Sequence, residues 1–156
     1  MEPSRQYAGW LISRWEGLAS IKPDGLVYPY ICPAGYPTQG FGRRVQSMTN
    51  PPITRKTAGE WLAEDLGKYE NAVLSQIPNL KKFPLTLAAI ISFTYNLGEG
   101  NLRISTLKKR LLVNDWKGAV LELQRWKYSK GQVLPGLVAR RAAEAQLIKI
   151  EHGLNN

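Results

Sequence analysis

The stretch WEGLASIKPDGLVYPYICPAGYPTQGFG, residues 15–42, contains the point where the character of the sequence changes. Helical periodicity ends early in it, and Pro, Gly, Tyr and Thr become frequent as far as residue 52. Residues 27–31 and 37–41 have the composition of short strands, and the Pro-Ala-Gly at 33–35 favours a turn between them. We therefore expect a small irregular β-hairpin region at residues 17–52, which we call the β lobe.

The sequence on both sides of the β lobe is helical in pattern. Apolar residues at helical spacing predict a first helix from an N-cap at Ser4 to Glu16. Behind a cap at Thr54 or Thr57, an apolar stripe with a period near 3.6 predicts a long helix that reaches residue 77. Further helices are expected at 85–97, 106–112, 115–126 and 136–150, with a break at 79–82 and a loop at 98–101.

The pattern as a whole predicts an α+β fold that is mainly helical. A chain of 156 residues fits one domain, so residues 1–156 are expected to form a single domain. In it the β lobe would face a helical lobe at 54–151 across a cleft, and such a cleft suits an extended polymer.

The charge of the chain indicates a negatively charged partner. Twenty-one Lys and Arg against twelve Asp and Glu leave a formal net charge of +9, which attracts nucleic acid, anionic lipid and bacterial cell wall alike. The basic residues are dispersed and form no nucleic-acid-binding signature, so nucleic acid is not the expected partner. No apolar stretch is long enough for a membrane span or a signal peptide, which predicts synthesis into the cytoplasm.

Several kinds of chemistry are excluded by residue counts. A single cysteine forms no internal disulfide, and ligands for a structural zinc site are lacking. The one histidine, His152, lies in a tail expected to be frayed, which argues against Ser–His or Cys–His catalysis and His-ligated metals. No motif requires an organic cofactor or a metal, so the expected chemistry is that of carboxylates.

Glu16 is the best candidate for a catalytic acid. Cleavage of a glycosidic bond needs a carboxylic acid that protonates the leaving oxygen. At the end of a helix and beside Trp15, the negative end of the helix dipole and an apolar ring would both disfavour the ionised form of Glu16. Taken alone, a glutamate at a helix end is more often simply solvated.

The surrounding residues change that assessment. Trp15-Glu16-Gly17-Leu18, followed by Tyr30 to Gly42 with Cys32, Thr38 and a Gly-Phe-Gly turn, closely resembles the active-site segment of the T4-lysozyme-like phage endolysins, the muramidases of glycoside hydrolase family 24. This resemblance implies that Glu16 is the acid, and that Cys32 and Thr38 hold the attacking water. A small buried hydrophobe is the ordinary alternative for Cys32.

The resemblance extends along the chain from Gln6 to Ile148 and implies a lysozyme-like fold. Ser92 to Gly98 is similar to the helix that enters the family's cleft, which implies that Tyr95 and Asn96 face the sugar. Arg125-Trp-Lys-Tyr and Val133 to Glu144 also match, and Arg125 becomes a further candidate for substrate binding.

Two features depart from the family pattern. The spacing from Glu16 to Cys32 is longer than usual, which implies an insertion around residues 22–27, and Asp24 within it offers an alternative second carboxylate. Arg43-Arg44 stands where many relatives have His-Thr, which predicts a guanidinium beside the acid that favours its ionised form.

The resemblance implies hydrolysis, with inversion, of the β-1,4 bond between N-acetylmuramic acid and N-acetylglucosamine in peptidoglycan. With it, residues 1–156 are expected to be one catalytic domain without a separate cell-wall-binding domain. It also implies a monomeric endolysin that waits in the host cytoplasm, reaches the periplasmic wall with the help of a holin, and releases phage by lysis. Two alternatives stay open: a non-catalytic or virion-associated peptidoglycan-binding relative, and a basic nucleic-acid-binding module.

Overall fold

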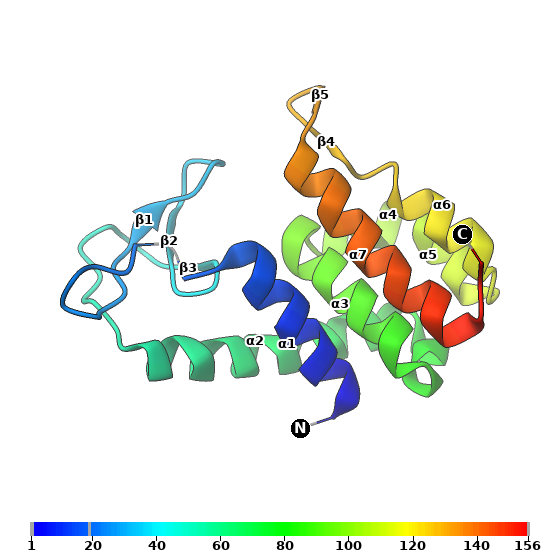
Figure 1. Cartoon of the computed structure of the whole chain (residues 1–156), viewed down its shortest axis with the longest axis horizontal. Coiled ribbons are helices and arrows are strands. Elements are labelled where there is room, and N and C mark those ends of the chain that lie inside the picture. Colours follow the sequence, from blue (N-terminus) through cyan, green and yellow to red (C-terminus); the bar gives the residue numbers. More distant parts are fainter. Residues whose placement is uncertain (1, 19, 156) are drawn as a thin grey trace.

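The computed structural model describes residues 2–18 and 20–155, so residues 1, 19 and 156 of the predicted domain lie outside the described part. Helices make up most of it, with a small sheet near the N-terminus and a short hairpin before the last helix (Figure 1). This arrangement confirms the predicted mainly helical α+β class. The helices are α1 (Pro3–Glu16), α2 (Arg55–Gln76), the 3-10 helix η1 (Pro78–Lys82), α3 (Pro84–Leu97), α4 (Glu99–Ile104), α5 (Thr106–Leu112), α6 (Trp116–Leu123) and α7 (Pro135–His152).

The first two long helices begin and end for local reasons. Helix α1 ends where Gly17 takes a φ of 63°, but its predicted N-cap is wrong. Glu2 occupies the cap position, and the Ser4 hydroxyl instead donates to Glu70 of α2 at 2.9 Å, so it ties two helices together. The cap of α2 is Thr54, whose side chain accepts from the backbone N–H of Thr57, as one of the two predicted alternatives has it.

Helix α3 is the centre of the hydrophobic core. It begins with Pro84 in its first turn, and every residue from 86 to 94 is buried. It packs most extensively against α1 and α7, and in Figure 1 it lies between them. A continuous apolar helix thus carries the framework on which the other helices are arranged.

The C-terminal half corrects four predictions. Gly98 ends α3, but residues 99–104 form α4 because Leu102 is buried. Helix α6 is capped by Asp115 as predicted, yet it stops at Leu123, before Trp126. An unpredicted hairpin of β4 (Tyr128–Ser129) and β5 (Gln132–Val133) follows. The tail is not frayed, because His152 stacks on Trp116 with ring centroids 3.8 Å apart.

The β lobe contains three very short antiparallel strands, β1 (Tyr30–Ile31), β2 (Pro37–Gln39) and β3 (Arg43–Arg44), in that order. Thr38 stands opposite both Tyr30 and Arg44 in the register. The segment predicted as an insertion turns back on itself, because fully buried Val27 bridges to Ile21 and to Ile53. In the described part of the chain, no helix has the length and apolar character needed to cross a membrane.

Candidate active site

Glu16 lies at the end of α1, where the helical part of the molecule meets the β lobe. Its side chain is 24% exposed, and its Oε1 accepts a hydrogen bond from Arg140 Nη1 at 2.8 Å. On the other side stands Gly42 with a φ of +95°, where an added Cβ would lie 3.1 Å from Glu16 Oε2. Glycine at this position therefore lets the β lobe approach the carboxylate closely.

Arg140 is a site residue that sequence reasoning missed. Its side chain, on α7, is only 4% exposed, and besides Glu16 it donates through Nη2 to the backbone oxygen of Ser92 at 3.2 Å. Arg140 and Glu16 are 124 residues apart, so no local pattern connects them. The available signal was a pair of arginines with Glu144 one helical turn later, in a segment, residues 136–145, whose other residues are small or apolar.

Glu144 fixes the arginines in place. It is fully buried and accepts from Ser92 Oγ and from Arg141 Nη2, each at 2.8 Å, while Arg140 Nε lies 3.6 Å away. Burial raises the pKa of Glu144, and the two guanidiniums and the Ser92 hydroxyl act against that shift. The guanidinium that holds Glu16 is thus itself oriented by a buried network.

The prediction of Arg43 or Arg44 beside the acid is wrong in its residue. Arg43 points to α2, where it donates to both carboxylate oxygens of Asp65 at 3.0 and 2.9 Å and lies over the ring of Trp61. Arg43 belongs to strand β3, but its guanidinium is held by helix α2, because both carboxylate oxygens of Asp65 accept hydrogen bonds from it. Arg43 therefore joins the β lobe to α2, and Arg140 supplies the guanidinium that touches Glu16.

Cys32 and Thr38 come together at the first turn of the β lobe. Thr38 is 5% exposed and its hydroxyl donates to the Tyr36 carbonyl at 2.9 Å. A backbone hydrogen bond at Tyr36 is the largest cause that lowers the pKa of the Cys32 thiol, and the Thr38 hydroxyl adds to it.

Tyr30 connects this pair with the acid. Burial raises the pKa of Tyr30, and the negative charges of Glu16 and then Cys32 raise it further, so the phenol lies within the field of both groups. Tyr30 also stands opposite Thr38 in the sheet. Glu16, Cys32 and Thr38, the three residues of the motif, therefore all lie near Tyr30.

Asp24, the alternative second carboxylate, is engaged in its own turn. Its oxygens accept from the Leu26 backbone N–H at 2.9 Å and from the Tyr28 hydroxyl at 2.5 Å. The tyrosine bond is the largest cause that lowers the pKa of this fully exposed carboxyl. These contacts give Asp24 a local structural role in the segment around residues 22–27.

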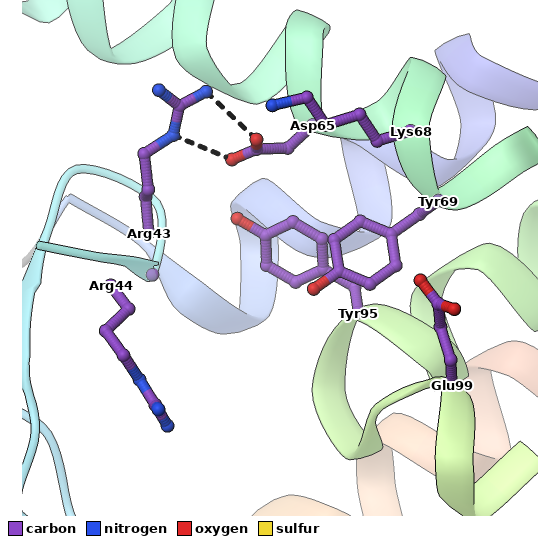
Figure 2. Close-up of a pocket in the computed structure, with 8 residues that line it drawn as sticks. Arg43, Arg44, Asp65, Lys68, Tyr69, Tyr95 and Glu99 are labelled. Carbon is purple, nitrogen blue, oxygen red and sulfur yellow. Dashed lines mark hydrogen bonds and ion pairs between the residues drawn. The ribbon is translucent and has the colours of Figure 1, made fainter. Parts of the chain in front are cut away.

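A pocket of about 450 Å³ opens beside Gly42, between the β lobe and helices α2 to α4 (Figure 2). Tyr95 lines it, and its hydroxyl donates to the Phe41 carbonyl at 2.6 Å. Its ring packs on Tyr69 at 5.1 Å between centroids, and burial raises the pKa of Tyr95 far above its usual range. The lining residues are Gly42, Arg43, Arg44, Asp65, Lys68, Tyr69, Tyr95 and Glu99.

The two other predicted substrate-binding residues do not line this pocket. Asn96 is half-buried, and its buried Oδ1 has no hydrogen-bond partner among residues 2–18 and 20–155. Arg125 is 76% exposed and pairs with Glu122 at 3.3 Å, three residues away. Of the candidates from the cleft helix, the structure therefore brings only Tyr95 to the pocket.

Residues 2–18 and 20–155 contain no group of three His, Cys, Asp or Glu placed to hold a metal ion.

Comparison with known proteins gives consistent matches. Residues 15–144 match the family model described as phage lysozyme. An endolysin of Acyrthosiphon pisum secondary endosymbiont phage 1 is 36% identical over 148 residues, which cover 89% of this chain and 92% of that protein. A SAR-endolysin of bacteriophage PS119 is 46% identical over 59 residues, which cover 38% of this chain and 35% of that protein.

Solved structures share the fold. The active form of the P1 phage endolysin Lyz superposes with a TM-score of 0.76 at 25% sequence identity, covering 96% of this chain and 85% of that chain. The likeness confirms the lysozyme-like fold that the sequence motifs implied.

Proposed function

Because the chain belongs to the phage lysozyme family, whose members among its relatives are endolysins, we propose that it hydrolyses peptidoglycan with Glu16 as the proton donor. The bond cleaved is the β-1,4 linkage between N-acetylmuramic acid and N-acetylglucosamine. One observation carries this proposal: the Glu16 carboxylate stands between a buried arginine and the Gly42 turn, next to a pocket of about 450 Å³. Residues 1–156 act as one catalytic unit in this proposal.

The Glu16–Arg140 contact prepares the acid for its task. It holds the carboxyl group of Glu16 in one orientation. In the proposed reaction the carboxyl group of Glu16 gives its proton to the leaving oxygen of the bound glycan.

We infer that the reaction inverts the anomeric configuration. The groups proposed to hold the attacking water are the Thr38 hydroxyl and the Cys32 thiol, neither of which is the carboxylate nucleophile that a retaining enzyme uses. The hydrogen bonds that lower the pKa of Cys32 increase its share of thiolate and thus its ability to accept a proton from water. Tyr95 and Asn96 on α3, and Arg125 beyond α6, are proposed to contact more distant parts of the glycan.

In the biological setting the protein is a monomer that accumulates in the host cytoplasm, reaches the periplasm through a holin pore and cuts the wall there. The relatives named SAR-endolysins favour a second route, release without a holin. A non-catalytic or virion-associated wall-binding protein is the second candidate function. Intact Glu16 and Thr38 at the site count against it.

The test is clearing of Gram-negative cells whose outer membrane has been permeabilised, with wild type, Glu16→Gln and Cys32→Ser side by side. Wild type is expected to clear, Glu16→Gln to be inert, and Cys32→Ser to report the contribution of the thiol. Equal clearing by wild type and Glu16→Gln would remove Glu16 from the mechanism. NMR of the first-formed anomer tests inversion, and a retained configuration or an anhydro-sugar end contradicts it.

A further inference from the structure

The pocket beside Gly42 contains two charged side chains, Arg44 and Glu99, that form no ion pair with any other described residue. Three cations line it, and two of them are paired: Arg43 with Asp65 at 2.9 Å, and Lys68 with Glu64 at 3.1 Å. For Arg44, no carboxylate partner is found in the described part of the chain. The carboxylate of Glu99 likewise has no Lys, Arg or His partner within residues 2–18 and 20–155.

Arg44 is held ready for a ligand. Its guanidinium lies over the ring of Tyr36, 3.5 Å from the centroid, which orients the planar group while its N–H edges stay available. Its backbone is paired with Thr38 on β2, so the strand that carries the proposed water-holding hydroxyl also positions this arginine. A planar guanidinium in this state matches a carboxylate with two parallel hydrogen bonds.

Glu99 faces the same space from the other side. It is the first residue of α4, directly after Gly98, and its side chain is exposed. In Figure 2, Arg44 and Glu99 lie on opposite sides of the pocket, with the rings of Tyr69 and Tyr95 between them. Burial is the main cause that raises the pKa of Tyr69, while Glu99 adds to that shift and Arg44 opposes it, so both charges act on one phenol.

A pair of opposite charges across one pocket suits a ligand that carries both charges. The sugars of a glycan strand offer hydroxyls and N-acetyl groups, whereas stem peptides offer carboxylates and, where they contain a diamino acid, an ammonium at another position of the same peptide. We propose that Arg44 and Glu99 are specificity-determining residues that bind a stem peptide at two separate points, with a carboxylate of the peptide on Arg44 and the ammonium of its diamino acid on Glu99. This inference rests on the proposed peptidoglycan hydrolase function.

Four soluble glycan oligomers test the proposal. The first carries stem peptides with free diaminopimelate, the second has the carboxylates of these peptides amidated, the third has their amine acetylated, and the fourth has no stem peptides. Wild type is expected to cleave the first with a KM about tenfold below the others, the size of one or two charge-assisted hydrogen bonds. Arg44→Gln should lose the response to amidation and keep the response to acetylation, and Glu99→Gln should do the reverse.

Matched controls remove a charge outside the pocket: Lys109→Gln on α5 and Glu60→Gln on α2, both exposed. They should behave as wild type. An equal loss on all four oligomers in the Arg44 and Glu99 variants, or no loss on any, overturns the proposal. Binding of the same oligomers to Glu16→Gln, measured by calorimetry, separates the two hypotheses. A preference for the first oligomer supports the recognition site even if hydrolysis does not depend on Glu16, and no preference sinks the recognition site alone.

Discussion

Two pairs of adjacent arginines meet the site from opposite sides and are held in different ways. On α7, Arg140 and Arg141 point into the core with side chains 4% and 1% exposed, and Glu144 contacts both of them. On β3, Arg43 is 24% exposed and Arg44 is exposed. The first pair lies around the buried carboxylate of Glu144, and the second lies at the edge of an open pocket.

The two pairs nonetheless have the same arrangement. Arg141 is bound by Glu144 and Arg43 by Asp65, while the other arginine of each pair is presented to the site. Arg140 reaches the catalytic candidate Glu16, and Arg44 faces the pocket. Because the pairs differ in burial, the loss of an ion-pair partner has different effects on stability. Water replaces a lost partner at the pocket edge, but it does not reach a carboxylate left without a partner in the core.

The largest effect is expected when the buried contacts of Arg140 are removed. Arg140→Ala leaves Glu144 with one guanidinium fewer and Glu16 without its ion pair, so we expect a loss of about 3–5 kcal/mol in the free energy of unfolding, together with loss of clearing activity. Urea unfolding followed by circular dichroism measures the first. Arg140→Lys keeps the charge and serves as the control, with a smaller loss. A loss below about 1 kcal/mol in the alanine variant would show that the network is solvated.

The next effect concerns the pocket pair. Arg43→Ala removes a bidentate contact to Asp65 and the contact with Trp61, at a position that water reaches partly. We expect a loss of about 1–2 kcal/mol, reduced at high salt, with weakened activity because the β lobe is less firmly joined to α2. Arg110→Ala, which breaks an exposed pair with Asp115, is the matched control and should cost less. Equal losses in both variants contradict the special position of Arg43.

The smallest expected effect lies at the far end of the helix that carries the buried pair. Burial lowers the pKa of His152 below its ordinary 6.5, so protonation favours the unfolded state. Stability from this group is complete above pH 6.5 and is lost as the pH falls through the lower folded-state pKa.

The variant His152→Gln tests this by keeping a side chain able to bond with Thr86 without titrating. The difference between urea midpoints at about pH 7.5 and pH 5.5 should be smaller in the variant than in wild type. An unchanged difference would mean that carboxylates alone set the acid response.

Much of the fold could be predicted from the sequence because its causes are local. Thr54 caps α2 and Asp115 caps α6 through bonds to backbone groups three residues away, and Pro84 starts α3. The high content of Pro and Gly also predicted the β lobe, because these residues favour turns through their local backbone conformation. Predictions failed where distant packing decided the outcome: Leu102 is buried and stabilises α4 after Gly98, and Trp116 stacks on His152 and orders the tail.

By itself, the sequence determined which residues are nominated for chemistry, because Glu16, Cys32 and Thr38 form a motif within one short stretch. Only the tertiary structure decided which partner each charge has. Arg140 reaches Glu16 across 124 residues, and Arg43 turns to Asp65 across 22. Local spacing specifies caps, turns and helix faces, but an ion pair depends on which surfaces burial brings together, and that is settled only when the core packs.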